Sequence, residues 1–163
     1  GAFLVWFLLS VLWGLFAIDK EILTERITFR IDLNTAIPQI IIFIQAGILY
    51  IIISLMRTRI FLAFISIYVV FVDALNLSAP LICIISGKYL YALFLGTMWI
   101  LLTIAIICFT ICANHSILKH RSIKINNQKT SEYLKYNIIL LKRFWIPGVI
   151  AAFLFSLMNS CLH

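Results

Sequence analysis

The sequence predicts an all-α integral membrane protein, a bundle of five transmembrane helices, or of four if the first segment does not span. The 163-residue chain is 64% apolar and only 12% charged. The charges gather in a few clusters separated by runs of roughly 20 uncharged residues, the length that a helix needs to cross a bilayer. A water-soluble domain is excluded, because it would leave much of this apolar surface uncovered.

Five apolar segments define the predicted spans of a single transmembrane domain. They cover residues 1–18, 37–56, 60–86, 89–113 and 144–162, with an outer loop at 19–36 and a basic cytoplasmic segment at 114–143. The first segment lacks both a basic region and a small residue at the cleavage position, so we interpret it as a retained span. Only "RTR" separates the second and third segments, which predicts an antiparallel hairpin.

Prolines and turn residues fit these boundaries. Pro38 and Pro147 lie within the first turns of their spans, where a missing N–H costs little. Gly87 and Lys88 form a tight turn between the third and fourth spans. Pro80 lies well inside the third span, so we expect that helix to bend there.

Basic residues set the expected orientation. A cytoplasmic N-terminus places nine of the 13 Lys and Arg residues inside, as the positive-inside rule requires. Isoleucine greatly outnumbers valine, which indicates AT-rich coding DNA and a bacterial source of low GC content. The predicted location is the bacterial inner membrane, with the C-terminus outside.

One acid, Asp73, lies inside a predicted span, within the stretch "YVVFVDALNLSAP". Ser66, Asp73 and Pro80 follow at seven-residue spacing with Asn76 nearby, a polar face that should point into the bundle. Counted from the hairpin turn, Gln45 on the second span differs in depth from Asp73 by roughly 3 Å. The predicted polar intramembrane cluster consists of Asp73, Asn76, Gln45 and Ser66.

Three roles stay open for Asp73. It is a structural acid, protonated or hydrogen-bonded to Gln45, Thr103 or a water. Alternatively it lines a hydrated cavity or a subunit interface as part of a switch, because intramembrane acids are usually functional. In the third interpretation it carries protons or cations, although the predicted spans contain no second acid or histidine to form a relay.

Small residues recur every four positions on two predicted spans, and such stripes let helix backbones approach closely in lipid. The last span carries Gly148, Ala152, Ser156 and Ser160, and the fourth carries Ala92 and Gly96. The stripes either pack spans within one subunit or join subunits. With several stripes in a small bundle, the pattern favours a homo-oligomer.

The segment 114–143 is the largest polar feature and is strongly basic. Thr130 and Ser131 are good N-cap residues, which predicts a helix from about residue 131 into the last span. Its positive charge has two interpretations. It either sets the topology and attracts anionic headgroups, with roughly 1 kcal/mol of attraction per basic residue, or it docks a cytosolic protein. Direct nucleic-acid binding is not expected, because Tyr133 and Tyr136 are its only aromatic residues. The candidate contacts are Lys119, Arg121, Lys124, Lys129, Lys135, Lys142 and Arg143.

No catalytic motif is present: there is no nucleophile motif, phosphate-binding glycine loop, carboxylate pair or HExxH. The sequence therefore predicts neither an enzyme nor a cofactor. Cys108, Cys112 and His115 share one helix face, but their spacing is not that of a known metal site, so no metal is predicted. The outer loop, in which "ITFRIDL" alternates like a short strand, is interpreted as a solvated connector or a surface for an outside partner.

In size, number of spans, absence of catalytic motifs and possession of a basic segment, the chain resembles the membrane subunit of the Kiwa anti-phage system. It is less closely similar to membrane immunity proteins against pore-forming colicins. The resemblance is architectural and transfers no functional residues. It implies an oligomeric membrane sensor that responds to phage and engages a cytosolic, DNA-binding effector. The leading hypothesis is a non-enzymatic sensor or anchor, and the alternative is a channel or transporter built around Asp73.

Overall fold

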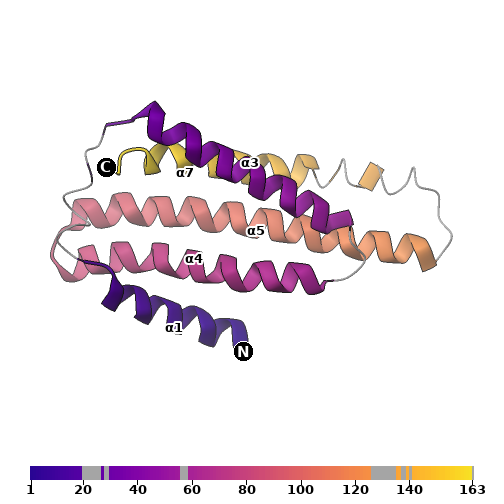
Figure 1. Cartoon of the computed structure of the whole chain (residues 1–163), viewed down its shortest axis with the longest axis horizontal. Coiled ribbons are helices and arrows are strands. Elements are labelled where there is room, and N and C mark those ends of the chain that lie inside the picture. The colour runs from indigo at the N-terminus through magenta and orange to yellow at the C-terminus, as the bar shows by residue number, and fades with distance from the viewer. Residues whose placement is uncertain are drawn as a thin grey trace.

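The computed structural model is all-helical in the part of the chain that it describes, residues 1–19, 27, 30–55, 59–125, 135–136, 139 and 141–162. Figure 1 shows five α-helices lying side by side. They are α1 (Ala2–Ala17), α3 (Leu33–Leu55), α4 (Ile60–Ile85), α5 (Tyr89–Ile125) and α7 (Ile146–Asn159). A π-helix, η1 (Leu141–Trp145), leads directly into α7. The predicted all-α class is confirmed at this level.

Three helices are long and apolar enough to cross a membrane. The qualifying stretches are Leu33–Ile53 of α3, Ile60–Ile85 of α4 and Tyr89–Lys119 of α5. Helix α1 has 16 residues, and η1 adds five residues to the 14 of α7. At ~1.5 Å per residue, α1 is shorter than the ~30 Å hydrocarbon core. Crossing by α1 and α7 stays a prediction.

Two helices extend beyond the predicted spans. Helix α3 begins at Leu33 rather than at residue 37, because Asp32 caps it: the Asn34 N–H donates to Asp32 Oδ1 at 3.0 Å and the Thr35 hydroxyl donates to Oδ2 at 2.9 Å. Helix α5 continues to Ile125 instead of ending at residue 113. The predicted start of a helix at residue 131 lies outside the described residues.

The turn between α4 and α5 agrees with its prediction. Gly87 has a φ of 72°, a left-handed conformation that glycine adopts without steric cost. The Lys88 N–H donates to the Cys83 carbonyl at 2.8 Å and the Gly87 N–H to that of Ile84 at 3.0 Å. This Schellman pattern ends α4 and reverses the chain.

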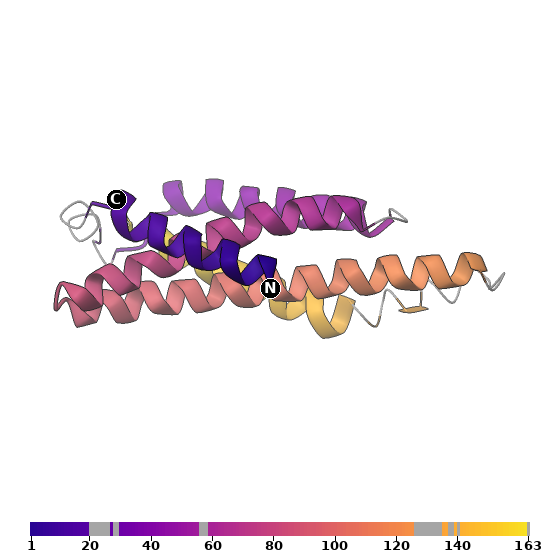
Figure 2. The same cartoon turned by 90° about the horizontal axis from the view of Figure 1, so that it is seen from below.

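Helix α5 is the centre of the packing. Figure 1 shows α1, α4 and α5 in a row, with α3 and α7 on the opposite side of α5, and Figure 2 shows the C-terminal part of α5 extending past the other helices. Helix α1 packs against α4, whereas α3 packs against α5 and α7. The two helices of the predicted α3–α4 hairpin run antiparallel but do not pack closely against each other. Both pack against α5 instead.

The described core consists of two hydrophobic clusters along α5. One surrounds Tyr50 and Phe109, and the other surrounds Cys83, Met98 and Phe155. The isolated bridge between Ile27 and Leu162 lies beside the second cluster. The sequence predicts a strand-like stretch at residues 27–33. Within its described residues, the isolated bridge at Ile27 is the one strand-type pairing.

Candidate functional site

A polar seam joins α4 to α5, and both helices contribute to it at seven-residue spacing. The seam consists of Ser66, Asp73 and Pro80 on α4 and of Thr110, Thr103 and Gly96 on α5. The antiparallel direction of the helices pairs these residues in that order. Asp73 and Thr103 make the direct contact, in which the Thr103 hydroxyl donates to Asp73 Oδ1 at 2.8 Å.

Asp73 is half-buried in this seam. The Thr103 hydroxyl also lies 2.9 Å from the carbonyl oxygen of Trp99, one turn earlier on α5. The buried indole N–H of Trp99 lies near the Asp73 carboxylate, yet makes no hydrogen bond of standard geometry within the described residues. Thr103, one of the three expected partners, is therefore the one that Asp73 uses in this structure.

The predicted four-residue cluster does not form. Gln45 is exposed on α3, and α3 packs against α5 and α7 rather than against the α4 face that carries Asp73. The Asn76 amide donates to its own helix at Val72, and the Ser66 hydroxyl donates to Leu62. Ser66 stays on the seam, whereas Asn76 lines a different groove.

Helices α1 and α4 meet at a close approach that the sequence interpretation missed. The Ser78 hydroxyl is fully buried and donates to the Val11 carbonyl of α1 at 3.1 Å. A Cβ atom at Gly14 would lie 2.7 Å from Ser78 Cβ, so glycine is required for this spacing. Ser10 and Gly14, four residues apart on one face of α1, are the small-residue signal that would have found it.

The small-residue stripe of α7 is covered by α5 within one chain. A Cβ atom at Gly148 would lie 3.0 Å from Phe109 Cε1. Ala152, Ser156 and Ser160 are all buried. The intramolecular interpretation of this stripe therefore applies.

The shorter stripe on α5 is covered in the same way. Ala92 is buried, and a Cβ atom at Gly96 would lie 3.9 Å from Pro80 Cβ on α4. Neither stripe is free to join two subunits, so neither supports the predicted interface between copies. Homo-oligomerisation stays a prediction that now lacks this support.

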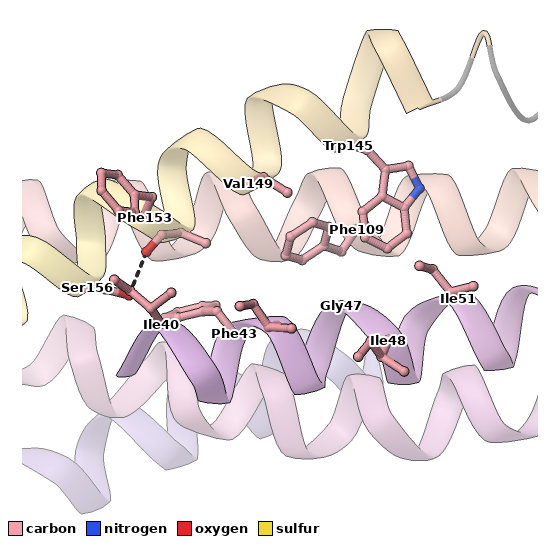
Figure 3. A pocket seen from close by; sticks show the side chains of 12 residues that line it. Ile40, Phe43, Gly47, Ile48, Ile51, Phe109, Trp145, Val149, Phe153 and Ser156 are labelled. Carbon is pink, nitrogen blue, oxygen red and sulfur yellow. Dashed lines mark hydrogen bonds between the residues drawn. The ribbon is translucent and has the colours of Figure 1, made fainter. Parts of the chain in front are cut away.

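An apolar groove of about 330 Å³ lies between α3 and α7, with α5 as its floor (Figure 3). Gly47 leaves the α3 wall open at mid-length, and a Cβ atom there would lie 3.6 Å from the Trp145 ring. Trp145 packs on Phe109 with ring centroids 5.0 Å apart. Ser156 lies at the other end, and its hydroxyl donates to the Ala152 carbonyl at 2.9 Å. We call this the α3–α7 groove.

A second groove, of about 370 Å³, separates α3 from α4. Its lining includes three amide side chains, Gln39, Asn76 and Asn159, together with Tyr50 and Tyr68. The Tyr50 hydroxyl lies 3.3 Å from that of Thr110, whereas Tyr68 is exposed. This groove fills the space between α3 and α4, which do not pack closely against each other.

The C-terminal part of α5 carries basic residues beyond the predicted membrane. Lys119 Nζ lies 5.8 Å from the centroid of the Tyr136 ring, a cation–π distance, and the Tyr136 hydroxyl lies 3.3 Å from His115 Nδ1. Arg121 and Lys124 lie on the final turns of α5. We call residues 114–125 of α5 the basic arm.

The other predicted basic contacts are scattered. Lys135, Lys142 and Arg143 are exposed, and the Arg143 guanidinium lies 5.7 Å from the centroid of the Phe144 ring. Lys129 lies outside the described residues. Among the described residues, no three His, Cys, Asp or Glu side chains gather as a metal site would require, and His115 contacts Tyr136 instead.

No protein-family model matches the chain, and neither a curated protein nor a solved structure matches it. The geometry of the seams, the grooves and the basic arm is therefore what bears on its function.

Proposed function

We propose that this protein is a multi-pass membrane protein that catalyses no reaction and presents its basic arm to a cytosolic protein partner. The observation that carries the proposal is the length of α5. Its 37 residues extend about 55 Å at ~1.5 Å per residue, whereas the hydrocarbon core is ~30 Å thick. The C-terminal end of α5 therefore extends beyond the hydrocarbon core of any membrane that α5 crosses.

Exposed apolar side chains support membrane insertion. Phe16 is 88% exposed, Leu93 70% and Phe64 67%, and comparable side chains cover the outer faces of α3 and α7. Water would leave these faces uncovered, whereas lipid solvates them. With the predicted orientation, the membrane is the bacterial inner membrane and the N-terminus is cytoplasmic.

The length of the basic arm leaves room for a protein partner at its end. The apolar stretch of α5 runs to Lys119, and Lys124 lies five residues, about 8 Å, farther along the axis. The attraction of a membrane surface falls off within a Debye length, ~8 Å at physiological ionic strength, so it is weakest at the end of the arm. There we propose that an acidic protein surface supplies the complementary charge.

The architectural resemblance to the Kiwa membrane subunit supplies a setting for this proposal. In that setting the membrane helices sense phage at the envelope, and the basic arm engages the cytosolic effector. This biological role rests on the resemblance, whereas the projection of the arm rests on α5.

Charge reversal on the arm tests the proposal. The full chain carrying Arg121→Glu and Lys124→Glu is crosslinked in cells, purified in mild detergent and compared with the wild type by mass spectrometry. We expect one cytosolic protein to be crosslinked at least tenfold less, since each change replaces an attraction by a repulsion. Arg57→Glu with Arg59→Glu is the matched control, because these two arginines are on the predicted cytoplasmic side and are not among the candidate contacts.

An unchanged set of crosslinked proteins in the arm variant would overturn the partner proposal. Membrane insertion is tested separately by alkaline carbonate extraction of the wild type. Release of the chain into the soluble fraction would overturn the membrane proposal itself.

A further inference from the structure

We propose that the α3–α7 groove binds an anionic phospholipid of the cytoplasmic leaflet, with one acyl chain in the groove and the phosphate at Lys142 and Arg143. The inference rests on the membrane insertion proposed above and is independent of the protein partner. It assigns the groove a ligand by its shape, its lining and the charge at one end.

The groove has the dimensions of one hydrocarbon chain. It extends along α3 from Ile40 to Ile51, about 16 Å at ~1.5 Å per residue. Its volume of about 330 Å³ over that length describes a narrow, elongated groove, the shape of a single extended acyl chain.

The depth of the groove matches one leaflet. A length of about 16 Å is close to half of the ~30 Å hydrocarbon core. Figure 3 shows the groove running from Trp145 at one end to Phe153 and Ser156 at the other, between α3 and α7. A lipid whose headgroup lies beside Trp145 therefore ends near the bilayer midplane.

The charge at the Trp145 end suits a phosphate. Lys142 and Arg143 are exposed on η1, in the turn that precedes Trp145. Guanidinium and ammonium groups bind phosphate oxygens, and basic sites between transmembrane helices on the cytoplasmic side favour anionic headgroups. In Figure 3 the indole nitrogen of Trp145 lies on the side of the ring away from Phe109. Tryptophan in this position is typical of the membrane interface.

Quenching of Trp145 fluorescence by brominated lipid tests the site. The full chain is reconstituted in phosphatidylcholine vesicles with a small fraction of brominated phosphatidylglycerol or, in parallel, brominated phosphatidylcholine. The signal of Trp145 is the difference between the wild type and Trp145→Phe. We expect brominated phosphatidylglycerol to compete for the site about 30-fold better, because two basic residues at ~1 kcal/mol each correspond to that ratio.

Two variant pairs separate the headgroup from the tail. Lys142→Gln with Arg143→Gln should abolish the preference for phosphatidylglycerol, whereas Arg57→Gln with Arg59→Gln removes equal charge from another part of the predicted cytoplasmic side and should retain it. Gly47→Leu fills the groove and should lower quenching by both lipids, whereas Ala63→Leu, at an exposed position of α4 outside the groove, should not.

Equal quenching by the two lipids in the wild type would overturn the inference, because it indicates only the unselective lipid that surrounds any membrane protein. Absence of quenching by either lipid, with the chain resistant to carbonate extraction, would mean that protein covers the groove and would also overturn it. If the chain is released by carbonate, the membrane proposal fails first, and this distinguishes the two failures.

Discussion

Replacing Thr103 by valine should weaken the α4–α5 seam by about 1.5 kcal/mol in the free energy of unfolding. Valine keeps the shape of threonine but removes the donor that lies 2.8 Å from Asp73 Oδ1. Interhelical hydrogen bonds in membranes average ~0.6 kcal/mol and reach ~1.7, and the loss falls toward the upper value because valine also leaves the half-buried Asp73 oxygen without this donor. A loss of this size is about a tenfold change in the folding equilibrium constant.

The measurement is unfolding of the purified chain in mixed micelles with increasing sodium dodecyl sulfate, monitored by circular dichroism. Thr97→Val is the matched control, because Thr97 donates to Leu93 within α5 at 2.8 Å and, in the part of the chain that the structure describes, its hydroxyl makes no hydrogen bond to another helix. Thr103→Ser retains the donor and should stay within ~0.5 kcal/mol of the wild type. Equal losses for Thr103→Val and Thr97→Val would refute the structural role of the bond.

Substitutions of Asp73 distinguish a structural role of this residue from a role in transport. Asp73→Asn keeps an oxygen that accepts from Thr103, so it should cost less stability than Asp73→Leu. Proton and cation flux into vesicles should be unchanged in the asparagine variant. Loss of a flux that the wild type shows, with the fold intact, would contradict the structural role and favour a carrier.

Three further substitutions have outcomes set by the packing. Gly14→Ala should lower the free energy of unfolding by ~1–3 kcal/mol, because the added Cβ meets the Ser78 side chain. Adding Ser78→Gly removes that side chain and should restore most of the lost stability. A double variant no more stable than Gly14→Ala would contradict the close approach. Gly148→Leu should destabilise by ~2 kcal/mol or more while the folded fraction keeps its oligomeric size in light scattering; a smaller assembly at unchanged stability would indicate a subunit interface instead. Tyr136→Ala should increase hydrogen exchange at the start of the basic arm by several-fold, through loss of a cation–π contact worth ~0.5–1 kcal/mol, and Tyr136→Phe should do so less because it keeps the ring.

Helix length and composition could be predicted from the sequence, but the neighbours of a polar residue could not. Counting residues from a turn gives the depth of Gln45, since each residue adds a fixed rise. It does not give the rotation of the helix or the helix that it faces, and α3 packs against α5 rather than α4. Thr103 satisfies both conditions, because the short turn at Gly87 and Lys88 places α5 directly against α4.

The small-residue stripes illustrate the same difference. Four-residue spacing identifies which face of a helix permits close packing, but not what covers that face. On α7 the cover is Phe109 of the same chain, so a pattern that favoured an oligomer describes an internal contact. The start of α3, by contrast, could have been predicted from the local sequence. Asp32 followed by Asn34 and Thr35 is a capping sequence, and it marks the helix start more accurately than the beginning of the apolar run does.

The packing also restricts how the membrane helices can act on the basic arm. Helices α3, α4 and α7 all pack against α5, whereas α1 packs against α4. Among the described helices, a displacement of α1, whose close contact is Gly14 on Ser78, should therefore act on α5 chiefly through α4 and the α4–α5 seam, where Asp73 and Thr103 make an interhelical hydrogen bond. If the arm signals to a partner, Thr103→Val should uncouple α1 from the arm while leaving the arm charges intact. Crosslinking of the partner would then persist in this variant but no longer respond to Gly14→Ala.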